Sequence, residues 1–196
     1  MKIDIIKGTL DSNTFIVSKG TTVLVIDAGA EIRDISDALG SRAPSAILLT
    51  HGHHDHTTHI SDYASKFDCP IYCHPQIGED LGIGQYHGDV KDPSKFNNFK
   101  SISDENDFKV GDLKIKPILC PGHSAASIAY MINGNLFTGD VLFNGTIGRT
   151  DLMENGHELM KNTLKKLLKV KYKTAWHGHG RSSTYKEQHR NIKLHL

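Results

Sequence analysis

A cluster of metal-ligand side chains stands early in the chain. His51, His53, Asp55 and His56 follow directly on the apolar stretch Ala46–Leu49. In a loop that leaves a buried strand, side chains two residues apart can point the same way, whereas adjacent ones diverge. The first two histidines can therefore face one ion, while the adjacent aspartate and histidine can serve a second. Such nitrogen and oxygen ligands suit zinc, and also iron or manganese.

The alternative is a polar loop that happens to be rich in histidine, and three later segments argue against it. Each ends an apolar, strand-like run and carries further ligand side chains. These segments are CPGHS at 120–124, TGD at 138–140 and HGHG at 177–180. The sequence therefore predicts one site assembled from four separate strand ends.

In this order, the four segments resemble the HxHxDH, PGH, TGD and GHG signatures of the metallo-β-lactamase-fold hydrolases, over nearly the whole chain. The resemblance implies two metal ions and seven ligands. These are His51, His53 and His123 for the first ion, Asp55, His56 and His179 for the second, and Asp140 as the bridge between them.

Two histidines depart from the family pattern. His177 stands where the family usually has proline, so it rivals His179 as a ligand, and the register of the motif favours His179. His59 stands where glycine usually follows the first motif, and we expect it to lie behind the ligands or on the surface.

The chemistry expected of such a site is hydrolysis. Two divalent ions about 3.5–4 Å apart can share a hydroxide, polarise a carbonyl and stabilise the leaving atom. Asp55 is expected to orient that hydroxide. Each ligating imidazole also needs an acceptor for its other N–H. Asp27, at the end of the apolar run Val23–Ile26, is the candidate, with a simple strand-end turn residue as the alternative.

The segment GRTD at 148–151 resembles the glyoxalase II-like (hydroxyacylglutathione hydrolase-like) branch, which cleaves acyl thioesters of glutathione. Persulfide dioxygenases share that segment and hold one iron, which makes them the alternative function. Many metallo-β-lactamases carry a cysteine where this chain has Asp140, which disfavours that activity. The chain ends seventeen residues after His179, so we expect a short form without the helical C-terminal domain and with poor discrimination between thiol carriers.

Composition limits the remaining possibilities. With 196 residues and 38% apolar content, the chain is expected to form a single hydrolase domain over residues 1–196. No run approaches the roughly 18 apolar residues of a membrane span, and no signal-peptide pattern opens the chain. The three cysteines cannot form a disulfide framework and fit a reducing compartment. We therefore expect a cytoplasmic protein.

The basic charge is uneven. Residues 161–196 hold ten Lys or Arg against one acid, Glu187, although the whole chain has a net charge of only +1. A solvated helix face is the simplest interpretation. A basic rim that attracts a small anionic substrate, such as an acyl thioester, is the functional one. No aromatic residues interleave the lysines of the helical segment 161–169, so we expect neither a nucleic-acid nor a membrane partner.

Strand-like and helix-like segments alternate in two similar halves. Helices are expected at 31–39, 59–66 and 157–168, and Thr184 opens a capping box with Glu187 before a final short helix. Strands are expected at 2–6, 14–17, 22–26, 46–49, 71–73, 108–110, 113–119, 127–132, 136–137 and 174–176. The pattern fits an α/β fold, the four-layer αββα sandwich of the resembled family. Gly82–Lys100, rich in turn residues, is expected to be a mobile loop beside the site.

Overall fold

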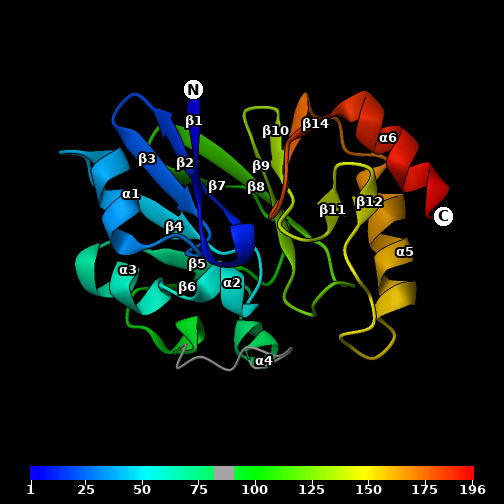
Figure 1. The fold of residues 1–196 in the computed structure, drawn as a ribbon, viewed down its shortest axis with the longest axis horizontal. Coiled ribbons are helices and arrows are strands. Elements are labelled where there is room, and N and C mark those ends of the chain that lie inside the picture. Colours follow the sequence, from blue (N-terminus) through cyan, green and yellow to red (C-terminus); the bar gives the residue numbers. More distant parts are fainter. Residues whose placement is uncertain (82–90) are drawn as a thin grey trace.

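The computed structural model describes residues 1–81 and 91–196. Two halves follow one another along the chain and lie side by side (Figure 1). The first half contains β1 (Lys2–Lys7), η1 (Thr9–Asp11), β2 (Asn13–Lys19), β3 (Thr22–Ile26), α1 (Ile32–Leu39), β4 (Ala46–Leu48), α2 (His54–Thr57), α3 (Ile60–Lys66), β5 (Ile71–Cys73), α4 (Ile77–Asp80), η2 (Pro93–Lys95) and β6 (Phe99–Ser101). The second contains β7 (Phe108–Val110), β8 (Leu113–Leu119), β9 (Ile128–Ile132), β10 (Asn135–Phe137), β11 (Leu142–Phe143), β12 (Thr146–Ile147), α5 (Gly156–Leu167), β13 (Thr174–Trp176), β14 (Ser183–Thr184) and α6 (Tyr185–Leu194).

Each half contributes one sheet. The first sheet has the strand order β1-β2-β3-β4-β5-β6, and the second the order β14-β13-β10-β9-β8-β7. Strands β3 to β6 run parallel, as do β10 and β13. The carboxyl ends of parallel strands meet at the same edge of a sheet, so the loops that follow β3, β4, β10 and β13 gather at the edges where ligand residues are expected.

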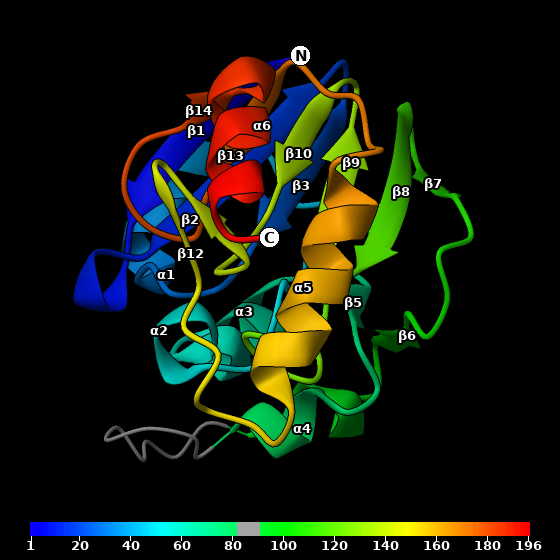
Figure 2. The ribbon, with the colours of Figure 1, turned by 90° about the vertical axis from the view of Figure 1, so that its right-hand side faces the viewer.

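Three apolar layers hold the molecule together. Alternate side chains of one strand face opposite sides of a sheet, and β2 shows this: Phe15 packs between the two sheets, whereas Ile16 packs against α1 and α3. On the far side, Leu136 packs against α5 and α6. Figure 2 shows these two helices on the outer face of the second sheet. The order of layers is helix, sheet, sheet, helix, which confirms the αββα sandwich.

The expected elements are largely present, with two corrections. The motif segment is not purely a loop, because residues 54–57 wind into the short helix α2. The expected loop 82–100 is only partly one: residues 82–90 lie outside the described residues, while 91–101 contain η2 and the edge strand β6. That strand escapes a sequence pattern because it has three residues, of which only Phe99 is apolar and packs against the core.

Within residues 1–81 and 91–196, none of the helices combines the length and the apolar character that crossing a lipid bilayer requires.

Candidate metal centre

The expected ligands come from four loops that meet at one end of the sandwich. His51 and His53 lie between β4 and α2, and Asp55 and His56 lie on α2 itself. The remaining three follow strands of the second sheet: His123 after β8, Asp140 after β10 and His179 after β13. The centre therefore joins the two halves of the molecule.

His51, His53 and His123 form the first group. All three are buried, and each offers a ring nitrogen within 4.8 Å of those of the other two. His53 Nδ1 lies 2.9 Å from His123 Nε2. Three imidazole nitrogens at this spacing make one face of a tetrahedral metal site.

Asp55, His56 and His179 form the second group, again with ligand atoms within 4.8 Å of one another. Asp55 Oδ2 lies 2.8 Å from His179 Nε2 and 3.4 Å from His56 Nε2. The neighbouring residues Asp55 and His56 both belong to this group, while His51 and His53 belong to the other. His51 and His56 also form a third close set with Asp140, which lies between the two groups.

Asp140 lies between the groups. Its Oδ1 is 3.3 Å from His56 Nε2, and its Oδ2 is 3.7 Å from His123 Nε2 and 3.6 Å from His179 Nε2. Gly178 makes this approach possible, because a Cβ there would collide with the Asp140 carboxylate. One carboxylate with an oxygen near each group is placed to bridge two ions.

The ligand atoms of the centre are arranged in a way that suits the binding of cations. His56 donates Nδ1–H to Asp27, which leaves its Nε2 lone pair facing the carboxylate oxygens of Asp55 and Asp140. Lone pairs and anionic oxygens repel unless a cation lies between them. His51 Nε2 is buried and has no hydrogen-bond partner in the described part of the chain. Both features suit resident cations.

Asp27 fixes the orientation of the rings, as expected. Its carboxylate accepts hydrogen bonds from the backbone N–H of Thr50 at 2.8 Å, from the hydroxyl of Thr50 at 2.9 Å and from His56 Nδ1 at 2.9 Å. Thr50 Oγ1 in turn lies 3.0 Å from His51 Nδ1. Asp27 is also a turn residue at the end of its strand, as the alternative interpretation predicted, because its φ of 64° lies in the left-handed region. One aspartate thereby orients a ligand in each group.

Burial sets the protonation of the first group. Desolvation lowers the pKa of His51 well below its usual value and that of His53 to about 4, and it lowers the pKa of His123 as well. Neutral imidazoles are the form that binds a metal. In the second group, burial favours the neutral form of His56, but the negative charges of Asp140 and Asp27 outweigh burial and raise the pKa of His56. Without a metal, a proton on His56 supplies the positive charge that these acids require.

Two residues that the motifs do not reveal hold the loop of His179. Ser12 donates its hydroxyl to the backbone carbonyl of Asp55 at 2.8 Å, and its backbone forms a bridge with His179. Asn13 is buried and donates its amide to the carbonyls of His177 and Gly180, each at 2.9 Å. Both residues precede or open β2, far from any ligand in sequence, so only the fold identifies them.

The rival histidines lie outside the ligand groups. His177 is buried, and its ring lies 2.9 Å from Thr138 Oγ1 and 2.8 Å from Ser183 Oγ. These contacts tie the TGD turn to the segment before α6. His59 lies beside Asp62 with a quarter of its side chain exposed and belongs to neither group.

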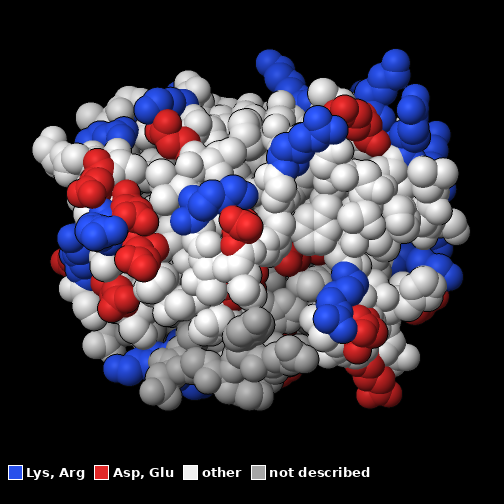
Figure 3. Space-filling model, in the orientation of Figure 1, with Lys and Arg blue, Asp and Glu red and all other residues white. Residues whose placement is uncertain are grey.

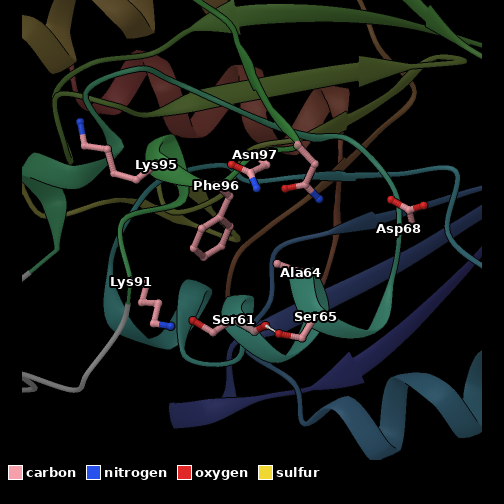
Figure 4. Close-up of a pocket in the computed structure, with 9 residues that line it drawn as sticks. Ser61, Ala64, Ser65, Asp68, Lys91, Lys95, Phe96 and Asn97 are labelled. Atoms are coloured by element: carbon pink, nitrogen blue, oxygen red, sulfur yellow. Dashed lines mark hydrogen bonds between the residues drawn. The ribbon is translucent and has the colours of Figure 1, made fainter.

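A pocket of about 410 Å³ opens beside the centre. It is lined by Phe143, Asn144, His179, Gly180 and Arg181. A second cavity of about 440 Å³ lies against α3 and η2, and the ring of Phe96 points into it (Figure 4). None of the residues that line the second cavity is an expected ligand.

Comparison with known proteins identifies the family. The Metallo-beta-lactamase superfamily matches residues 8–179, so this chain belongs to that superfamily.

Two relatives show the range of functions near it. The chain is 29% identical to the "Probable metallo-hydrolase YqgX" of Bacillus subtilis, over 88% of this chain and 87% of that protein. It is 31% identical to a "Hydroxyacylglutathione hydrolase" of Glaesserella parasuis, over 76% of this chain but 57% of that protein. The chain therefore has glyoxalase II-like homologues and matches little more than half the length of this one.

Solved structures share the fold. The crystal structure of "BLEG-1 B3 metallo-beta-lactamase" matches with a TM-score of 0.87 and 25% identity, with full coverage of both chains. That of "TTHA1623 in a di-iron-bound form" matches with a TM-score of 0.81 and 27% identity, over 97% of this chain and 98% of the other.

Proposed function

We propose that this chain is a dinuclear metal hydrolase that cleaves acyl thioesters in the manner of glyoxalase II. The observation that carries the proposal is the presence of two complete ligand groups with Asp140 between them. The similarity to a hydroxyacylglutathione hydrolase and the GRTD segment at 148–151 direct the choice of substrate toward thioesters.

The residues of the centre have two proposed functions, which are to bind the metal ions and to orient the nucleophile. Bound at the two groups, divalent ions would supply Lewis acidity and a hydroxide at neutral pH. Asp55 is the acid that we assign to orient that nucleophile, because its carboxylate lies within the second group and remains 15% exposed. Its pKa is lowered, since the hydrogen bond with His179 and the charge of His56 outweigh the effect of burial. The carboxylate is therefore ionised at neutral pH.

Zinc is the first candidate metal for these ligands, with iron and manganese as alternatives. The di-iron form of TTHA1623 supports iron as a serious candidate.

The pocket beside His179 supports an anionic substrate. Phe143 offers an apolar ring whose centroid lies 6.1 Å from that of His179, and Arg181 offers an exposed cation. An acyl thioester whose thiol half carries carboxylates would meet both an apolar wall and a positive charge there.

The test is release of thiol from lactoylglutathione and other small acyl thioesters by the zinc-loaded protein without oxygen. We expect anaerobic turnover, and Asp55→Asn to lower kcat by roughly 10²–10⁴-fold, the usual size of a positioned acid–base contribution. Asp62→Asn is the matched control, because Asp62 is an exposed acid that pairs with His59 outside the centre. That variant should keep its activity.

Two other outcomes would replace the proposal. Oxygen uptake with glutathione persulfide, without thioester cleavage, would identify a persulfide dioxygenase with one iron. Faster hydrolysis of a chromogenic β-lactam than of any thioester would identify a β-lactamase.

A further inference from the structure

Asp80 is a buried acid that the proposed chemistry does not use. It ends α4, and only 1% of its surface is exposed. A carboxylate is costly to bury unless it is well hydrogen-bonded. Its position therefore calls for an explanation.

The partners of Asp80 belong to two different ligand loops. Its Oδ2 accepts the backbone N–H of Gly52 at 3.0 Å and the hydroxyl of Ser124 at 2.8 Å. Gly52 separates His51 from His53, and Ser124 directly follows His123. One oxygen atom thus joins the two loops that supply all three ligands of the first group.

The packing around this oxygen leaves little freedom. Any Cβ at position 52 would lie 2.7 Å from Asp80 Cβ and would strike the carbonyl of Ile77, so α4 presses directly on the first loop. Ser124 Oγ is held from a second direction by Ser127 Oγ at 2.9 Å. Thr57 donates its hydroxyl to the Gly52 carbonyl at 3.2 Å, which fixes the other side of that residue.

We propose that Asp80 is a positioning residue that sets the separation of the His51–His53 loop from the His123 loop and so determines the metal affinity of the first group alone. Its hydrogen bonds reach the chain beside His51, His53 and His123, and among the described residues its carboxylate makes no hydrogen bond to Asp55, His56 or His179 themselves. Burial raises the pKa of the Asp80 carboxyl, and its hydrogen bonds to Ser124 and Gly52 oppose that rise. The inference rests on the metal-binding part of the proposed function and not on the substrate.

The experiment measures metal affinity in two backgrounds. In His179→Ala the first group keeps its three ligands, and in His123→Ala the second group does. Apo-protein of each background is titrated with Co²⁺ and Zn²⁺ against a chromophoric chelator, and the visible Co²⁺ spectrum reports the ligand geometry. Loss of an outer partner typically lowers metal affinity 10–100-fold.

We expect Asp80→Ala to weaken binding at least tenfold in the His179→Ala background, with a changed Co²⁺ spectrum, and less than twofold in the His123→Ala background. Asp80→Asn should restore most of the affinity, because its amide oxygen can accept both hydrogen bonds. Ser124→Ala should weaken the first group in the same direction.

Asp92→Ala is the matched control. Its carboxylate packs on Gly78 of α4, the helix that carries Asp80, and caps η2 through Ser94, and neither of these contacts involves a ligand loop. Equal weakening in both backgrounds, or an equal effect of Asp92→Ala, would overturn the inference. If Asp80→Ala does not fold, as judged by circular dichroism of the apo-protein, Ser124→Ala and Asp80→Asn decide the question by the same titrations. Because no substrate enters, a failed thioesterase assay leaves this test intact.

Discussion

At the scale of single residues, the centre depends on two acids, Asp27 and Asp80, that form hydrogen bonds with the ligand loops without being ligands themselves. Asp27 reaches one ligand in each group through Thr50 and His56, and Asp80 reaches the loops of the first group. His123 is oriented in a third way, because its Nδ1–H donates to the backbone carbonyl of Arg149 at 3.1 Å. The geometry of the ligands therefore depends on contacts beyond the ligands themselves.

The titration of Asp80 provides a test by pH. Burial raises its pKa to about 6, from 3.8 for an ordinary aspartate. Below pH 4 both the folded and the unfolded chain hold this proton. As pH rises from 4 to 6, the unfolded chain releases the proton first, which favours unfolding. The folded protein is therefore destabilised by roughly 2–3 kcal/mol across this window, and the cost persists above pH 6.

Asp80→Asn lacks this titration. We expect the free energy of unfolding of metal-free Asp80→Asn, minus that of the wild type, to grow by roughly 2–3 kcal/mol between pH 4 and pH 7. Urea unfolding at several pH values measures it, with Asp37→Asn on the exposed face of α1 as the control. A difference that stays constant with pH would show that Asp80 is not buried as described.

The ligands could be predicted from the sequence because each stands directly after an apolar, strand-like run and carries a family motif. Asp80 could not. It lies on a four-residue helix without an apolar repeat, and its partners Gly52 and Ser124 are 28 and 44 residues away. Contacts of that kind arise from tertiary packing and leave no local pattern.

At the scale of elements, α6 supports the pocket beside the centre. Gln188 and Asn191 are buried on its inner face. Gln188 donates to the carbonyl of Phe143 at 2.6 Å, and Asn191 to that of Thr146 at 2.8 Å. These two amides hold the β11–β12 hairpin, which supplies the aromatic wall of the pocket.

We expect Gln188→Ala to raise KM for an acyl thioester about 3–10-fold, the effect of losing one hydrogen bond of about 1 kcal/mol, while the metal content stays the same. Steady-state kinetics together with elemental analysis separate the two quantities. Lys186→Ala, on the exposed face of the same helix, should change neither. Loss of metal in Gln188→Ala would show that α6 supports the centre itself.

The longer elements followed from sequence patterns, as did the three-residue strands β5, β7 and β13, but several other short elements did not. The capping box of Thr184 and Glu187 opens α6 as predicted. By contrast, α2, α4, β11, β12 and β14 have two to four residues each. Such elements are too short to show a period, and they form because neighbouring segments satisfy their backbone groups.

At the scale of the whole molecule, the centre lies where the two halves meet, so metal ions should bind the folded chain and not the unfolded one. At free metal a hundredfold above Kd, one site adds about 2.7 kcal/mol of stability, or roughly 5–10 °C in Tm for a chain of this size. Calorimetry of apo and reconstituted protein measures the shift.

The double variant His123→Ala with His179→Ala, which removes one ligand from each group, is the control. It should show little or no shift at the same metal concentration. An unchanged Tm in the wild type, with metal shown to be bound, would contradict a centre that links the halves.

Basic and acidic side chains gather on different parts of the molecular surface. Lys and Arg gather over α6, whereas acids are prominent near α1 (Figure 3). This matches the excess of basic residues after position 160. Arg181 in the pocket wall belongs to that basic segment, so the segment would favour the approach of the anionic substrate proposed above.

The spread of the ligands along the chain has a consequence for biosynthesis. His179 follows His51 by 128 residues, and β13, which positions it, pairs with β10 and β14 of the second sheet. While the ribosome is still translating the second sheet, the emerging polypeptide holds the HxHxDH segment without its distant partners. The second group cannot be complete until His179 has left the exit tunnel, whereas the first needs only the earlier His123. A metal ion at the second group would therefore find its full set of ligands only near or after the end of translation, later than an ion at the first group.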